Sequence, residues 1–190
     1  MKRFLILFLL LCPLVCGAQE PGAHLKFKGI PIDGNYESFA QKLIDKGFVQ
    51  LYAGDDAITL AGTFMAEPNV TVNIYPDPAT QVVAGVAAAI FTNATWPGTE
   101  QKYREVVAAY QEKYGKPTEH EEMFDDDPEF DLARMLYIMA GHCHYYSLWE
   151  VEGGSVSVYI DYYKGNVCIT CAYIDAQNAE ARRKAIIDDI

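Results

Sequence analysis

The sequence predicts an α+β fold of two tandem units, each a helix followed by an antiparallel meander, with the helices packed on one face of the sheet. Apolar residues at helical spacing appear around Phe39 and Leu43 and again in Gly98 to Tyr114, and strand-like segments follow each time. The alternation in Asn69 to Tyr75 recurs in Gly154 to Ile160, which favours two diverged copies of one unit. Chance recurrence of a short strand pattern is the alternative explanation.

The first unit is expected over residues 26–95. A strand-like stub runs from Lys26 into a turn at Gly34, and a helix containing Phe39, Leu43 and Ile44 follows and stops at Gly47. Between Val49 and Phe91 the sequence pattern becomes typical of strands. Proline-containing turns separate three predicted strands, which are Ile58 to Leu60, Val70 to Ile74 and Val82 to Phe91.

The second unit is expected over residues 96–178. Its helix, Gly98 to Tyr114, ends at Gly115-Lys116-Pro117, and an acidic loop with Asp127 at the helix entry leads to a short helix around Leu132 to Met139. Strands are predicted near His144 to Val151, Ser155 to Tyr162 and Asn166 to Ile174. Residues 179–190 are expected to form a C-terminal helix or a frayed tail.

The N-terminus has the pattern of an export signal. Lys2 and Arg3 precede an apolar run from Phe4 to Val15, and small residues end the segment at Ala18. We therefore predict a signal peptide over residues 1–18 and a periplasmic or secreted mature protein. Lipidation of Cys16 is the less favoured alternative, because Val15 is bulky where a small residue is expected. The apolar run is too short for a permanent membrane span, so no transmembrane helix is expected.

The charge balance narrows the range of partners. The chain has 15 basic and 26 acidic residues and a formal net charge of −11. Nucleic acid is not expected as a partner, because phosphate binding needs a basic stripe and the sequence has none. An anionic membrane surface is disfavoured for the same reason. The expected partner is therefore an unidentified protein or small ligand, and no cofactor is predicted.

Strand alternation predicts a recognition surface. If Glu152 pairs with Ser155 across a Gly153-Gly154 turn, and Tyr163 with Asn166, then Trp149 and its apolar neighbours share the core face. The opposite face is aromatic and polar, as expected of a binding surface, although an ordinary solvated face would look similar. The candidate contact residues on that face are Tyr75, His144, Tyr146, Tyr159 and Asp161.

No motif predicts a catalytic residue, so a non-catalytic binding module is the leading interpretation. Cys168 and Cys171 have redox or zinc spacing, but they lie within a strand, where residues three apart point to opposite faces. The acidic run Asp125 to Glu129 lacks the alternation and the glycine of a calcium loop. The alternative function is metal binding or metal-assisted catalysis that uses His142 and His144, which share a strand face.

Several short segments resemble a family of small exported proteins of gut Bacteroidetes. They are Gly29 to Gly34, Phe39 to Leu43, Lys46-Gly47-Phe48, Lys113-Tyr114-Gly115, Trp149, Tyr173-Ile174-Asp175 and Asn178. The predicted architecture also resembles that of β-lactamase-inhibitor-like proteins, which bind a partner with an open sheet face. This resemblance implies a binding role, whereas inhibitory activity does not follow from architecture alone, and no catalytic residues carry over.

Overall fold

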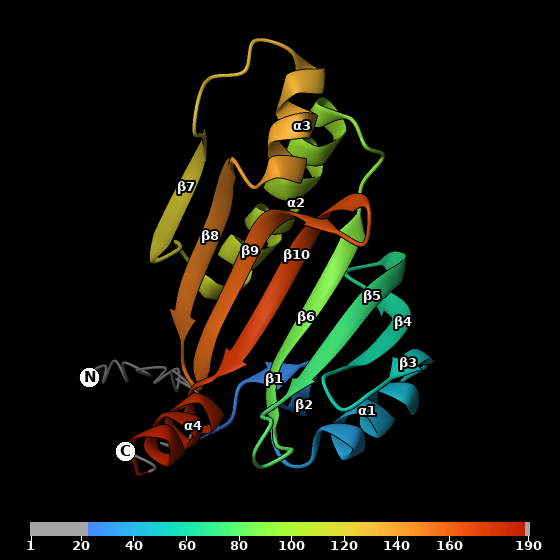
Figure 1. Cartoon of the computed structure of the whole chain (residues 1–190), viewed down its shortest axis with the longest axis vertical. Helices are drawn as coiled ribbons and strands as arrows, with labels where there is room; N and C mark the ends of the chain where they lie inside the picture. The colour runs from blue at the N-terminus through green and yellow to red at the C-terminus, as the bar shows by residue number, and fades with distance from the viewer. Residues whose placement is uncertain (1–22, 189–190) are drawn as a thin grey trace, which may run out of the picture.

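A computed structural model describes residues 23–188 and confirms the α+β class. Within this range the chain forms four helices and a large antiparallel sheet (Figure 1). The predicted signal peptide lies outside the described residues. In the described part of the chain, no helix combines the length and the apolar character needed to cross a bilayer.

The first half of the chain forms one helix and six strands. The elements are β1 (Lys26–Phe27), β2 (Ile30–Pro31), α1 (Tyr36–Ile44), β3 (Val49–Ala53), β4 (Ile58–Phe64), β5 (Glu67–Pro76) and β6 (Val83–Phe91). The side chain of Asn35 caps α1 by accepting hydrogen bonds from the backbone N–H groups of Glu37 and Ser38. The sequence predicts that the helix stops at Gly47. The helix ends at Ile44, and Gly47, with φ of +95°, lies in the turn that follows.

The second half adds three helices and four strands. The elements are α2 (Trp96–Tyr114), β7 (Glu119–Phe124), α3 (Asp131–Ala140), β8 (Cys143–Val151), β9 (Gly154–Tyr163), β10 (Asn166–Asp175) and α4 (Ala176–Asp188). Strand β7 is not among the predicted strands. The N-cap of α3 is Phe130, so Asp127 does not form the helix entry that the sequence suggests.

The main sheet joins the two halves of the chain at its centre. Its strand order is β3-β4-β5-β6-β10-β9-β8-β7, and β1 pairs with β2 in a separate two-stranded sheet. The central neighbours β6 and β10 pair antiparallel, with Ala88 opposite Cys171. Each half therefore supplies four consecutive strands, but α3 interrupts only the second set. That the halves are copies of one unit remains a prediction.

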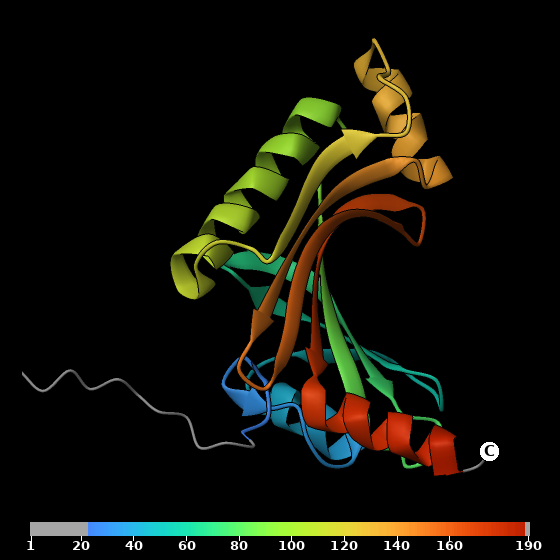
Figure 2. The same cartoon turned by 90° about the vertical axis from the view of Figure 1, so that its left-hand side faces the viewer.

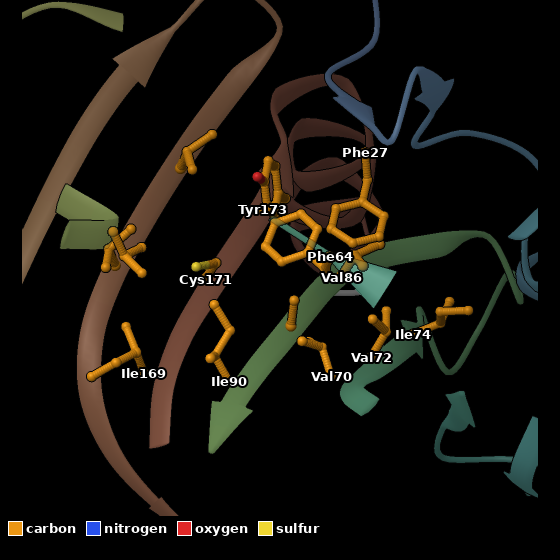
Figure 3. Close-up of a cluster of buried hydrophobic side chains, with 14 of the residues drawn as sticks. Phe27, Phe64, Val70, Val72, Ile74, Val86, Ile90, Ile169, Cys171 and Tyr173 are labelled. Atoms are coloured by element: carbon orange, nitrogen blue, oxygen red, sulfur yellow. The ribbon is translucent and has the colours of Figure 1, made fainter. Parts of the chain in front are cut away.

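The convex side of the sheet carries the hydrophobic core. Figure 2 shows the sheet curving away from α2, and Figure 3 shows part of the buried cluster on this side. Phe27 of the small sheet stacks on Phe64 and meets the edge of Tyr173, both at 5.2 Å between ring centroids. Trp149 is 1% exposed, and its indole N–H donates to the carbonyl of Gly115 (2.9 Å). The strand face predicted to be core is therefore the core.

Polar groups inside this core are paired. The hydroxyls of Tyr103 and Ser147 lie 3.0 Å apart, and those of Tyr110 and Tyr173 lie 2.6 Å apart. Burial raises the pKa of Tyr103 to about 12 and also raises the pKa of Tyr110 and of Tyr173. These links fasten α2 to β8 and β10, so the helix is held on the sheet by hydrogen bonds as well as by apolar contact.

The hairpin registers show one success and one error. Tyr163 pairs with Asn166, as predicted. Glu152 does not pair with Ser155, because Val151 pairs with Gly154 and Glu152-Gly153 forms the turn. The error is two residues, so every side chain keeps its predicted face. Gly154 is the first residue of β9, where a Cβ would lie 2.0 Å from the carbonyl oxygen of Ile174.

The helices do not all lie on one face, which corrects part of the predicted architecture. Helix α1 packs on β4 and β5, α2 packs on β8, β9 and β10, and α3 packs beside α2. Their buried side chains belong to the core cluster of the convex side. Helix α4 instead follows β10 directly and borders the opposite side, at the lower end in Figure 2.

Candidate binding surface on the concave face

The side of the sheet opposite α2 is the candidate binding surface. The name concave face is used below for the following residues: Thr59, Thr71, Asn73, Tyr75, Gly85, Ala87, Ala89, Tyr146, Ser157, Tyr159, Asp161, Tyr163, Cys168, Thr170, Ala172 and Ile174. The pairing of β4 to β6 and β8 to β10 aligns these residues in rows across the strands. One row runs from Tyr146 and Tyr159 through Thr170 and Ala89 to Thr71.

Tyr146 and Tyr159 are direct cross-strand neighbours near one side of this face. They pair in the ladder between β8 and β9, and both are partly exposed. The hydroxyl of Tyr146 donates to Oε2 of Glu119 on the edge strand β7 (3.1 Å). Burial, with the nearby charge of Asp161, raises the pKa of Tyr159 to about 12. Both phenols are therefore neutral donors and apolar contact surfaces at neutral pH.

Asp161 is tied to its neighbours on the concave face. Its Oδ2 accepts a hydrogen bond from the hydroxyl of Thr170 (3.3 Å), and the thiol of Cys168 lies 3.6 Å from the same hydroxyl. Burial raises the pKa of Cys168 to about 11, so its thiol is protonated at neutral pH. This cluster can hydrogen-bond a ligand, but it holds no activated nucleophile.

The centre of the concave face is closed, which the sequence does not predict. Tyr163, at the end of β9, donates to Oδ1 of Asn73 on β5 (3.1 Å), and the hydroxyl of Thr59 donates to the same oxygen (2.9 Å). Asn73 is 5% exposed and Thr170 is 4% exposed. Figure 2 shows the reason, since the end of the β9–β10 hairpin curls over this side of the sheet. The closure leaves the region that contains Tyr75 and Tyr159 accessible.

Tyr75 lies in the accessible region beside α4. A pocket of about 510 Å³ is bounded there by Tyr75, Tyr159 and one side of α4. Its floor is made of small residues from β6 and β10, among them Gly85, Ala87 and Ala172. The residues that α4 contributes were not predicted as site residues, because residues 179–190 were expected to be a plain helix or tail.

The side chain of His144 is hydrogen-bonded to the acidic loop. Nδ1 of His142 lies 2.5 Å from Oδ2 of Asp125, and Nε2 of His144 contacts Oδ1 of the same carboxylate. These hydrogen bonds lower the pKa of Asp125. The two histidines therefore anchor the acidic loop to the start of β8. All five predicted contact residues lie on the predicted side of the sheet, since His144 is two residues from Tyr146 in the regular strand β8, but the imidazole of His144 contacts Asp125.

Metal binding at His142 and His144 stays a prediction. Across residues 23–188, no three His, Cys, Asp or Glu side chains are grouped closely enough to hold a metal ion. The described cysteines Cys143, Cys168 and Cys171 are all free thiols. Cys171 is in the convex core and Cys168 is on the concave face, so the predicted opposition of this pair is confirmed.

A second pocket, of about 540 Å³, lies near α3. It is lined by Trp96, Phe124 and Tyr145 together with carboxylates that include Glu100 and Asp127. The guanidinium of Arg134, another lining residue, lies 5.9 Å from the centroid of the Trp96 ring. A cation of the protein itself is therefore already placed against the aromatic wall of this pocket.

The chain matches no family model, no curated protein and no solved structure. Its function is therefore inferred from the residues described above.

Proposed function

We propose that this protein is an exported, non-catalytic binding module that holds its partner against the concave face. The observation that carries the proposal is the pocket beside Tyr75 and Tyr159, on the side of the sheet that α1, α2 and α3 leave uncovered. Pockets that combine aromatic walls with a few polar groups are the usual form of ligand sites. Export is inferred from the residue pattern of positions 1–18.

The chemistry of the concave face supports binding rather than catalysis. Tyr159 has a raised pKa, Cys168 is a protonated thiol, and Asp161 is hydrogen-bonded to Thr170. Such groups offer donors, acceptors and flat apolar surface without an activated base or nucleophile. Tyrosine is well suited to this role because it provides large contact area with little conformational entropy to lose.

The proposal includes an origin from two copies of a helix-plus-meander unit, as in the β-lactamase-inhibitor-like architecture that the sequence resembles. Two features support it. Each half contributes four consecutive strands, and the last strands of the halves, β6 and β10, are neighbours at the centre. Tandem copies joined in this way present one continuous sheet face to a partner.

The test uses a double variant, Tyr146→Ala with Tyr159→Ala. Tyr162→Ala is the matched control, because Tyr162 lies on β9 beside Asp161, points to the other side of the sheet and is 37% exposed. Immobilised wild type, control and double variant are incubated with extract of the producing cells, and retained species are quantified by mass spectrometry. We expect species that wild type and control retain equally and that the double variant loses. Equal retention by the double variant would reject the concave face as the binding surface.

A further inference from the structure

The pocket beside α4 differs in charge from the rest of the molecule. The chain has 26 acidic residues and a net charge of −11, yet within the described residues no Asp or Glu lines this pocket. Arg182 and Arg183 of α4 both line it. By contrast, five carboxylates line the pocket near α3. The α4 pocket is thus the one of the two that suits an anion.

Of the two arginines, Arg182 has the capacity to bind a ligand. Arg183 is engaged by Glu180 through two hydrogen bonds of 2.7 and 2.8 Å. Among residues 23–188, Arg182 makes one ion pair, from its Nε to Oδ2 of Asp77 at 3.5 Å, and its side chain is 55% exposed. Its terminal amino groups can therefore donate to a carboxylate or sulfonate.

The rest of the pocket is mainly apolar, with small residues along its floor. The small side chains of Ala87 and Ala172, with Gly85, leave a hollow over the middle of β6 and β10. Ile174 and Ile186 line it and are 50% and 57% exposed, which is unusual for large apolar side chains placed together. The volume of about 510 Å³ lies within the range of roughly 300–1,000 Å³ that is usual for small-ligand sites.

The position of α4 is fixed, so the pocket is formed before any ligand arrives. Nδ2 of Asn178 donates to the carbonyls of Ile32 and Val83, at 2.8 and 2.9 Å. The carboxylate of Asp175, fully buried, accepts from the backbone N–H of Asn178 and of Leu25. These bonds anchor the first turn of α4 to two other segments of the chain, and a preformed site needs less ordering on binding.

We propose that this pocket binds a small amphipathic anion, a molecule with an apolar body and one carboxylate or sulfonate group. The anionic group meets Arg182, and the body lies over Ala87 and Ala172 between Tyr75 and Tyr159. This inference rests on the proposed function, because it names the class of ligand that one end of the concave face takes.

The experiment measures binding of dodecanoate to the purified full chain by isothermal titration calorimetry below the micelle concentration. Dodecylammonium, with the same alkyl chain and the opposite charge, is the matched ligand. We expect saturable dodecanoate binding with a dissociation constant below about 1 mM and at least about tenfold weaker binding of dodecylammonium. Absence of dodecanoate binding, or equal binding of the two ligands, would overturn the proposal.

Three variants locate the binding. Arg182→Gln removes the cation, and Ala172→Phe fills the hollow; each should weaken dodecanoate binding at least about tenfold. Lys184→Gln, on the same helix but outside the pocket lining, removes the same charge and should leave binding within about twofold. Circular dichroism confirms folding before each titration. Unchanged binding in both pocket variants would place the ligand elsewhere and refute the assignment.

The two proposals fail in different ways. If the Tyr146 and Tyr159 double variant loses its captured species while wild type does not bind dodecanoate, only the ligand class is wrong. If dodecanoate binding depends on Arg182 and Ala172 but the double variant captures the same species as wild type, the pocket stands and the wider binding surface is wrong.

Discussion

The two faces of the main sheet differ in burial: the convex face carries the core, and the concave face is partly exposed. On the convex side, Trp149 and Tyr103 are almost completely buried, and the indole N–H and the phenol hydroxyl are both hydrogen-bonded. On the concave side, the neighbouring residues along the same strands are tyrosines, threonines and small residues, and Tyr75 is 42% exposed. Alternation along a strand thus assigns packing to one set of residues and contact with a ligand to the other.

The comparison predicts a large difference between two aromatic residues on opposite sides of β8. Trp149→Ala removes a fully buried ring and leaves the Gly115 carbonyl without its donor, so we expect a loss of about 3–5 kcal/mol in the free energy of unfolding. Tyr146→Ala, on the concave side, should cost less than about 1 kcal/mol. Urea unfolding followed by far-UV circular dichroism measures both. Similar costs for the two variants would break the division between the faces.

An intermediate effect is expected where α4 joins the body of the protein. Asn178→Ala removes the donor to two backbone carbonyls, Ile32 and Val83, and should lower the free energy of unfolding by about 1–3 kcal/mol. Asn166→Ala is the control, because its side-chain amide donates to Lys164 within the exposed hairpin turn. We expect that control to change stability by less than about 0.5 kcal/mol. A neutral Asn178→Ala would mean that α4 is not anchored and that its pocket is not preformed.

A smaller effect tests whether the closed centre of the concave face contributes to stability. Asn73→Ala leaves the hydroxyls of Thr59 and Tyr163 without their acceptor, and we expect a loss of about 1 kcal/mol. A double-mutant cycle with Thr59→Val isolates the Thr59–Asn73 hydrogen bond from other effects of each change. Additive costs in that cycle would show that the hydrogen bond does not stabilise the fold, and the centre would then behave as ordinary solvated sheet.

The smallest effect concerns the acidic loop and depends on pH. Hydrogen bonds from His142 and His144 lower the pKa of Asp125 from its ordinary value of 3.8. A lowered carboxyl pKa contributes stability above that ordinary value, and the contribution disappears as pH falls through the lowered pKa. The melting temperature of Asp125→Asn should therefore be below that of wild type near pH 5, and the difference should shrink as the pH falls progressively below 3.8. Asp127→Asn, with the same loss of charge in the same loop, should not reproduce this dependence.

The face to which each strand residue points was predictable from the sequence, because a shift of one residue would have moved Trp149 from the core to solvent. The hairpin at Lys164-Gly165 was also predictable, but the second glycine of Gly153-Gly154 was misleading. That glycine is needed because β10 passes close to it, a contact between distant segments that local patterns do not reveal. The two-residue register error follows from reading a packing glycine as a turn glycine.

Other features depend on tertiary structure that no local pattern encodes. Strand β7 has the sequence Glu119-His120-Glu121-Glu122-Met123-Phe124, whose charges oppose a strand assignment until β8 is there to pair with it. Helix α4 has no buried residue, so it lacks an apolar stripe that would predict where it lies. Burial of Asn73 requires sheet curvature and a hydrogen bond to Tyr163, ninety positions away in the chain.

The central position of β10 also has a consequence for biosynthesis. Strand β10 pairs with β6 at the middle of the sheet, and β6 is synthesised well before β10 because β7, β8 and β9 lie between them in the chain. In that interval β6, which contains no charged residue from Val83 to Phe91, exposes an apolar hydrogen-bonding edge of the kind that pairs with other chains. We therefore expect a polypeptide that ends before Asn166 to aggregate more readily than one that contains β10.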